Sequence, residues 1–308
     1  MTQNFSAVRR ALSVSLIMAA SACTPDVVSP PSQALSSDHP VAADLAPPVS
    51  VYANEPLGFT HVLENSASGL PGTIGFTSAL DGFWRMNASP NTKAITDTSA
   101  PCSPPGVWSA TYPSGLTAGS GPVTLWGQIS KTSAPEARQW YLRACLKVGR
   151  SGGFQNQPSG TKMMIISLSG DPALKRCSVI PIIQGDGTVV VKSSWNANVT
   201  FECAGLLPTV KFMQLPGVGR PIKSDVWQVH EWIVDVGDVD QSNGRFRWWI
   251  DGKLVLDRKN NFRTRANGLT HGVYWWRWTP TWGGMVGVRT RPDDYQIDDI
   301  YISSFGKP

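Results

Sequence analysis

Short apolar runs separated by clusters of Gly, Pro, Asn and Ser make up the chain from Gly58 to Pro308. β-Branched and aromatic residues suit a pleated strand, and the residues between the runs suit turns. A helical period is absent except around Ala134–Arg138, where we expect a turn or a short helix. The pattern predicts strands at Val123–Trp126, Trp140–Lys147, Met163–Leu168, Thr188–Ser193, Val199–Glu202, Trp227–Val236, Arg245–Ile250, Leu254–Asp257 and Ile297–Ser303.

Two turn sequences connect three of these strands. Asp251-Gly252 separates Arg245–Ile250 from the strand after it, and Asp-Gly is typical of a two-residue type I′ turn. Ser242-Asn243-Gly244 separates Arg245–Ile250 from the strand before it in the same way. Consecutive antiparallel strands in one domain of many short strands predict an all-β fold, a two-sheet antiparallel β-sandwich of the jelly-roll type.

The predicted strand Arg245–Ile250 has different side chains on its two faces. Its sequence is RFRWWI, so period-two alternation puts Phe, Trp and Ile on one face, which we expect in the core. The other face carries Arg245, Arg247 and Trp249. Indole rings stack on the apolar faces of sugars, and guanidinium groups bind hydroxyls or carboxylates. This set is therefore a candidate sugar-binding surface, and the alternative is an Arg–Trp stack that binds no ligand.

Composition excludes two classes of protein. The chain has 13 Trp among 308 residues and 16% charged residues, against about 25% charged residues in an average soluble domain. Disordered chains are poor in aromatic residues, so most of this chain is expected to fold. No run of about 18 apolar residues is present, which excludes a protein with several helical membrane spans.

The N-terminus resembles an export signal. Arg9 and Arg10 precede the apolar run Ala11–Ala20, which is too short to span a bilayer. Small residues then lead to Cys23, as in a bacterial lipobox, although the position three residues earlier lacks the usual large aliphatic side chain. We expect residues 1–23 to direct export to the bacterial cell envelope or the medium, with lipidation of Cys23 or plain cleavage nearby as alternatives. Membrane contact is expected only through such a lipid anchor.

Residues 24–56 differ in composition from the rest of the chain. They contain seven prolines and no Lys, Arg or Trp, so they cannot bury a core and are expected to be a disordered tether before a domain at 57–308. Two of the 27 basic and four of the 22 acidic residues precede Leu57, which leaves the domain with a net charge of +7. This charge favours an acidic partner such as a uronic-acid polysaccharide, or it serves solubility alone. No lysine run or helical motif indicates nucleic acid.

Four cysteines come after Cys23. An even number in an exported protein indicates two disulfides, and pairing of sequence neighbours, Cys102 with Cys145 and Cys177 with Cys203, is our first choice among three connectivities. The sequence has no CxxC spacing, so we predict no zinc site and no cofactor. Calcium in a loop stays an alternative near Asp238, although that segment lacks the Gly and Glu positions of an EF-hand.

The last third of the domain resembles a known superfamily. The runs Trp227-Gln-Val-His-Glu231, Asn243-Gly-Arg-Phe-Arg-Trp-Trp-Ile-Asp-Gly252, Thr281-Trp-Gly-Gly284 and Asp298-Asp-Ile-Tyr-Ile-Ser303 are similar to the concanavalin A-like lectin/glucanase superfamily, and more narrowly to its polysaccharide-lyase-like jelly rolls. A strand at Trp140–Lys147, then a loop and Lys162, fits the same pattern. The resemblance implies the fold; function by fold alone is analogy.

The resemblance also suggests site residues. The alternating acids of a retaining glucanase are missing after Glu231, so we expect no such hydrolase. A lyase that cleaves uronates by β-elimination needs a base, an acid and a group that neutralises the carboxylate. The candidates are His230, Tyr274 and Tyr301 for proton transfer, with Lys162, Arg245 and Arg247 for binding. A structural role for His230 is the alternative.

Glu231 and Trp282 complete the candidate site. Glu231 either binds sugar hydroxyls or forms a cross-strand ion pair with a neighbouring Arg. Trp282 belongs to a tryptophan-rich segment at 271–284, which either caps the core or lines a carbohydrate groove, and we favour mixed use with one or two of its four Trp exposed. The sequence leaves three hypotheses: a carbohydrate-binding protein that uses a Trp/Arg-lined concave sheet face, a polysaccharide lyase, or a structural surface module. The oligomeric state stays open.

Overall fold

The computed structural model describes residues 52–66, 84–86, 90–102, 104–123, 125–128, 137–155, 160–168, 177–195, 209–262, 273–283 and 286–305. They belong to a unit that spans Ala46–Pro308. The described residues form strands and turns without a helix, and hence contain no helix that could cross a membrane.

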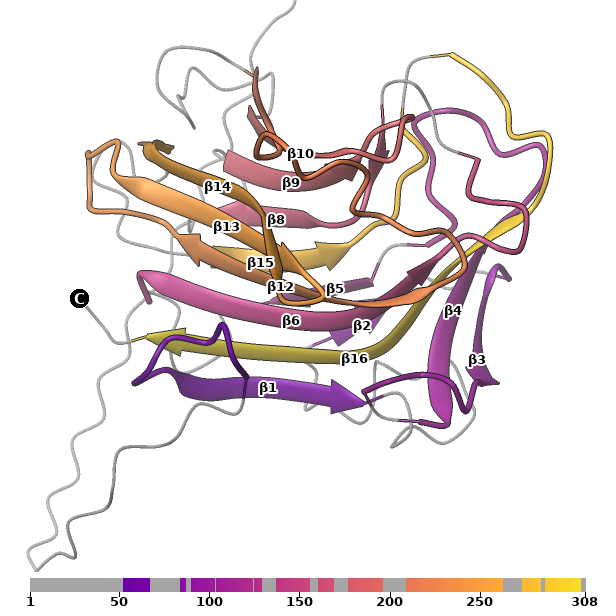
Figure 1. Cartoon of the computed structure of the whole chain (residues 1–308), viewed down its shortest axis with the longest axis horizontal. Helices are drawn as coiled ribbons and strands as arrows, with labels where there is room; N and C mark the ends of the chain where they lie inside the picture. Colours follow the sequence, from indigo (N-terminus) through magenta and orange to yellow (C-terminus); the bar gives the residue numbers. More distant parts are fainter. Residues whose placement is uncertain are drawn as a thin grey trace, which may run out of the picture. The chain divides into compact units, whose positions relative to one another are not determined.

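Sixteen strands of the described residues build two antiparallel sheets (Figure 1). Sheet A has the order β14 (Lys253–Phe262), β13 (Gly244–Ile250), β12 (Trp227–Asp235), β6 (Gln139–Val148), β16 (Asp293–Phe305), β4 (Gly106–Tyr112) and β3 (Thr92–Thr96), and β1 (Thr60–Ser66) also pairs with β16. Sheet B has the order β11 (Thr209–Met213), β10 (Val189–Trp195), β9 (Cys177–Ile183), β8 (Ile165–Leu168), β15 (Val273–Trp278), β5 (Leu125–Gln128) and β2 (Trp84–Met86), and β7 (Thr161–Lys162) pairs with β9.

A tryptophan-rich core lies between the sheets. Trp232 of sheet A and Trp278 of sheet B meet edge to face, with ring centroids 6.1 Å apart. One continuous cluster of buried side chains includes residues of both sheets, and its largest fully buried members are Trp140, Trp232, Trp248, Trp276 and Trp278. We call the face of each sheet that is turned away from this cluster its outer face.

The predicted β-sandwich is confirmed. Four predicted strands lie within observed ones and four more overlap observed ones, and β16 extends well beyond the predicted Ile297–Ser303. The two predicted hairpins, β12–β13 and β13–β14, are both present. At the second turn Asp251 and Gly252 have φ values of 49° and 74°, as a type I′ turn requires. The predicted strand Val199–Glu202 and most of the predicted helical turn lie outside the described residues.

The residues before β1 pack on the outer face of sheet A. We call Tyr52–Phe59 the N-terminal strap. Tyr52 and Phe59 join an apolar cluster there, and Glu55 is buried. The folded unit therefore includes Tyr52–Pro56, which the composition had assigned to the tether.

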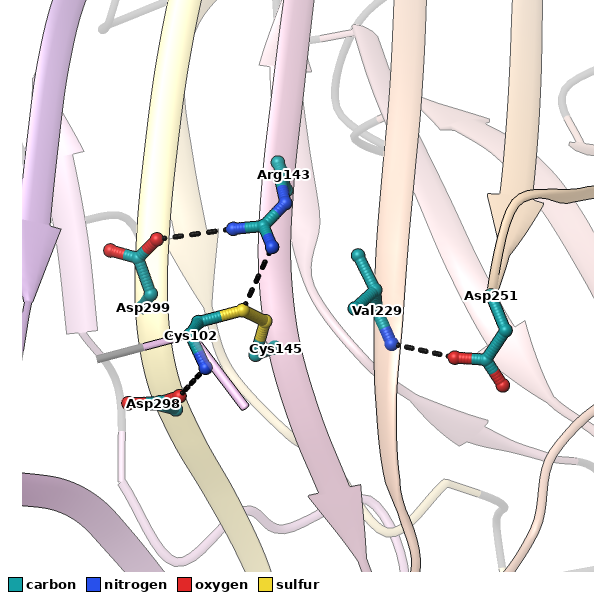
Figure 2. The surroundings of a disulfide bond; sticks show 7 residues. All are labelled: Cys102, Arg143, Cys145, Val229, Asp251, Asp298 and Asp299. Carbon is teal, nitrogen blue, oxygen red and sulfur yellow. Dashed lines mark hydrogen bonds and ion pairs between the residues drawn. A yellow bond between two sulfur atoms is a disulfide. The ribbon is translucent and has the colours of Figure 1, made fainter. Parts of the chain in front are cut away.

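A disulfide joins Cys102 to Cys145 of β6, as predicted. Figure 2 shows Arg143 beside it, donating to Cys102 Sγ and pairing with Asp299 Oδ2 at 3.3 Å. The backbone N–H of Cys102 also donates to Asp298. The bond thus fixes the loop before β4 to the middle of sheet A. Cys23 and Cys203 lie outside the described residues.

Candidate functional site

The predicted sugar-binding residues share the outer face of sheet A. Trp249 pairs with Glu231 in the β12–β13 register, and Arg245 and Arg247 occupy alternate positions of β13. The alternation of the RFRWWI sequence therefore places Arg245, Arg247 and Trp249 on one face, as predicted.

That face is already covered by the protein's own groups. Glu231 is buried, and its two carboxylate oxygens accept hydrogen bonds from the Tyr141 hydroxyl at 2.6 Å and from the Asn54 amide at 2.8 Å. Burial together with the Glu231 bond raises the pKa of Tyr141 far above its usual range. Glu231 is therefore tied to the N-terminal strap rather than to an arginine.

The three other residues on this face are also engaged. Arg245 forms a bidentate pair with Asp257, with distances of 2.8 and 2.6 Å, and this pairing lowers the pKa of Asp257. The Arg247 guanidinium lies over the Trp249 ring at 5.2 Å from its centroid. Trp249 is only 8% exposed, so little of its ring is open to a sugar. Arg247 and Trp249 therefore form an Arg–Trp stack, which the sequence offered as the alternative to a sugar-binding surface.

His230 lies on the opposite side of the sheet, in the core. Its side chain is 1% exposed and packs against the rings of Trp232 and Trp248. The indole Nε1–H of Trp248 donates a hydrogen bond to His230 Nδ1 at 3.2 Å. Burial lowers the pKa of His230 to about 3. The hypothesis that His230 joins Arg245, Arg247 and Trp249 in one site is therefore wrong. The in–out alternation of β12 gives the reason, because His230 and Trp232 share a face.

Two further candidate site residues, Tyr301 and Trp282, are buried and bind other parts of the protein. The Tyr301 hydroxyl donates to Glu55 Oε1 at 2.9 Å beneath the strap, and burial raises the pKa of Tyr301 above its usual range. Trp282 is 2% exposed within the core cluster, and its Nε1–H donates to the Gln155 carbonyl at 2.7 Å. Neither residue faces an open sheet surface, so the core-capping alternative applies to Trp282.

The outer face of sheet B has a different character. Ile180, Ile182 and Val190, each at most 5% exposed, form a buried cluster separate from the core, whereas their neighbours Val179 and Val191 belong to the core. Successive residues of a strand point to opposite faces, and residues paired across strands share a face. The outer-face residues of the neighbouring strands can therefore be traced through the register.

Two rows of basic positions result from this register. Trp126 of β5 pairs with Arg85 of β2 on one side and with Arg277 of β15 on the other. Lys192 of β10 pairs with both Ile180 of β9 and Lys211 of β11. The two rows therefore hold basic positions on β2, β15, β10 and β11.

Lys162 and Tyr274, predicted as site residues, also belong to sheet B. Lys162 pairs with Ile182, which places it on the outer face. Tyr274 stands in β15 where the pairing with β8 is irregular, between Val273 and Trp275. Trp275 itself pairs with Gln128 and with Ser167, in a row of polar positions.

Sheet B carries an unbalanced charge. Its eight strands contain no Asp or Glu and five basic residues, which are Arg85, Lys162, Lys192, Lys211 and Arg277. Only Lys162 was among the site residues predicted from the sequence. The available signal was the absence of acids from these segments taken together, and it needs the strand order to become visible.

The described residues give no support to a metal centre in the two places where ligands gather. Cys102, Cys145 and Asp298 bring ligand atoms within 4.8 Å, but both thiols are consumed in the disulfide. At the acidic loop considered for calcium, Asp238 binds Arg138 and Asn243 at 2.6 Å each. A cation would have to displace these partners.

Comparison with solved structures identifies the fold. The PL-14 alginate lyase from Aplysia kurodai has a TM-score of 0.60 and 13% identity, over 80% of this chain and 99% of that one. A double mutant of alginate lyase Aly36B, in complex with an alginate trisaccharide, has a TM-score of 0.58, 12% identity and coverage of 80% and 99%. The endo-β-1,4-glucuronan lyase from the fungus Trichoderma reesei has a TM-score of 0.51, 11% identity and coverage of 80% and 96%. No family model and no curated protein matches the sequence. The chain therefore shares the jelly-roll fold of these solved structures.

Proposed function

We propose that this chain binds a polysaccharide of uronic acids across the outer face of sheet B. The observation that carries the proposal is the charge of this sheet: five cations and no acid in its eight strands. A uronate polymer presents one carboxylate per sugar, and Lys and Arg bind carboxylates through charge-assisted hydrogen bonds. A surface of one sign also concentrates polyanions near it.

Aromatic positions on the same rows support a sugar ligand. Trp126 lies in register between Arg85 and Arg277, and Trp275 is two residues from Arg277 in β15. Indole rings accept the apolar faces of pyranoses while cations bind their carboxylates. The proposal keeps the predicted ligand class but moves the site from sheet A to sheet B.

Cleavage by β-elimination is the second candidate function. Tyr274 stands at a pairing irregularity of β15, three residues from Arg277, and irregular pairing next to an active site often redirects a side chain. A Tyr can move a proton while an Arg neutralises the uronate carboxylate. The three structural neighbours are alginate or glucuronan lyases. Tyr274 replaces His230 as the leading candidate for proton transfer.

An exported location fits the same proposal. The Cys102–Cys145 disulfide favours an oxidising compartment, where polysaccharides of envelopes and surroundings are accessible. The signal at 1–23, anchoring through Cys23 and the Cys177–Cys203 pair remain part of the proposal.

Two measurements on the same protein test binding and cleavage. Migration is followed in native gels that contain alginate, glucuronan or neutral dextran, and the ultraviolet absorbance of unsaturated uronates is followed in solution. We expect retardation by a uronate polymer and none by dextran. Equal migration in all gels would contradict binding. A rise in absorbance that disappears in Tyr274→Phe supports the lyase, and a flat trace with every polymer would refute it.

A further inference from the structure

A second basic site lies outside sheet B. A cavity of about 330 Å³ opens between the β13–β14 hairpin and the loop that joins β11 to β12. Three cationic residues line it: Arg220, Lys223 and Lys253. Ligand pockets commonly have volumes of about 300–1,000 Å³, so the space suits one sugar unit or little more.

The wall of the cavity is held by a buried glutamine. Gln228 is 3% exposed, and its amide N–H groups donate to the Pro221 carbonyl at 2.9 Å and to Asp251 Oδ2 at 3.0 Å. Its carbonyl accepts from the Lys223 backbone N–H at 2.7 Å. Leu215 N–H also donates to the Val255 carbonyl at 2.8 Å, which fixes the loop to β14. The cavity is therefore formed before any ligand arrives.

The charges of the cavity favour an anion. Lys223 and Lys253 are exposed, and neither has an ion-pair partner among the residues that the structure describes. The third cation, Arg220, lies near Asp186, a carboxylate outside the lining. Hydrogen bonds from Thr188 are the main cause of the lowered pKa of Asp186, and Arg220 contributes to it. The one carboxylate in the lining, Asp251, already accepts from Gln228 and from the Val229 N–H at 2.9 Å.

The remaining lining is apolar. Val218, Ile250 and Val255 face the same cavity as the three cations. A small inorganic anion would leave this apolar surface unused, and Asp251 would repel it. A carboxylated pyranose uses every part: the carboxylate meets the lysines, the C–H face meets the valines and Ile250, and a hydroxyl donates to Asp251.

We propose that this cavity binds the terminal unit of a uronate chain, as a site additional to the outer face of sheet B. The choice of a uronate as ligand rests on the proposed function. The cavity suits a chain end because its limited volume fits a single ring, whereas the sheet offers rows of positions for a longer segment.

The test is calorimetric titration of the full chain with D-glucuronate, methyl glucoside and inorganic phosphate. We expect glucuronate to bind and the other two to bind at least about tenfold more weakly, since each lacks either the charge or the ring. Lys253→Ala should weaken glucuronate by about tenfold, and the matched control Lys93→Ala, an exposed lysine on β3, should change nothing. Equal weakening in both variants, or phosphate binding as tight as glucuronate, would overturn the proposal.

A further variant separates this site from the sheet. Arg277→Gln should lose retardation by the polymer and keep the affinity for glucuronate. Loss of both would mean that the monosaccharide binds to sheet B, which refutes the cavity site. Glucuronate binding that depends on Lys253, in a protein that no uronate polymer retards, would support the cavity and contradict the proposed function.

Discussion

The two sheets carry similar residue types but differ in the balance of acids and bases on their strands. The strands of sheet A carry eight acids and eight bases: Glu64, Glu231, Asp235, Asp257, Asp293, Asp294, Asp298 and Asp299 against Lys93, Arg143, Lys147, Arg245, Arg247, Lys253, Arg258 and Lys259. The strands of sheet B carry five bases and no acid. Arginine and tryptophan occur on both sheets, so their presence alone does not identify a binding surface.

The acids and bases of the sheet A strands pair with one another. On sheet A, Arg245 pairs with Asp257 and Arg143 with Asp299, and the N-terminal strap covers Glu231. A cation with a fixed carboxylate partner has little to offer an external one, because binding would first break the internal pair. The strands of sheet B contain no carboxylate side chain, so no such pair forms within these strands.

The largest expected effect comes from removing cations of sheet B. The triple variant Arg277→Gln, Lys192→Gln, Lys211→Gln should weaken binding of a uronate polymer by about a hundredfold or more, because each charged contact contributes about 1.5–3 kcal/mol. Affinity gel electrophoresis measures the change. The matched control is Arg245→Gln, Arg247→Gln, Lys259→Gln on sheet A, which changes the net charge equally. Equal losses in both triple variants would show that net charge, and not the face, decides binding.

The acid sensitivity of sheet A tests the structural role of His230. Its pKa is about 3 in the fold and 6.5 when exposed, so protons bind the unfolded chain preferentially. Above pH 6.5 the contribution of His230 to the unfolding free energy is constant. Between pH 6.5 and 5, protonation of His230 in the unfolded chain lowers the unfolding free energy by about 2 kcal/mol. Urea unfolding of wild type and His230→Gln across this range measures it. The variant keeps an acceptor for Trp248 and should lose this part of the pH dependence; identical pH profiles would contradict burial of His230.

The strap should matter for stability and not for binding. Glu55→Ala removes the acceptor of the buried Tyr301 and Ser303 hydroxyls, which should lower the unfolding free energy by about 1–3 kcal/mol. Chemical denaturation measures the loss, and retardation by the polymer should not change. Weaker retardation at full stability would place the ligand on sheet A instead.

The smallest effect is expected at Arg247. Its stack on Trp249 is half-buried, so Arg247→Gln should cost about 0.5–1 kcal/mol of stability and leave polymer affinity unchanged. Thermal unfolding and gel retardation report the two quantities. A loss of affinity similar to that of Arg277→Gln would remove the distinction between the faces.

The fold could be predicted from sequence because its signals are local. The Asp251-Gly252 turn and the RFRWWI alternation each depend on adjacent residues, and both were predicted correctly. The site could not be predicted in the same way. Arg85, Trp126 and Arg277 come from three segments that only the strand order brings together, although Arg277 lies within the tryptophan-rich segment 271–284.

His230 and Trp249 show that a conspicuous motif does not indicate where its side chains lie. Each stands in a conspicuous motif, yet one faces the core and the other lies under Arg247 beside the strap. The strap has no local signal in the sequence, because its contacts join residues more than 170 positions apart, such as Asn54 and Glu231. A proline-rich segment gives no sign of where it docks.

Hydrogen–deuterium exchange of the full chain, with and without a uronate oligosaccharide, tests the central claim most directly. The outer face of sheet B is the proposed binding surface, so peptides that cover β15, β5 and β10 should exchange more slowly with the ligand. Peptides that cover β6 and β16 of sheet A, which contribute no residue to the cavity, should exchange as before. Protection of β6 and β16 without protection of β15 would contradict the account.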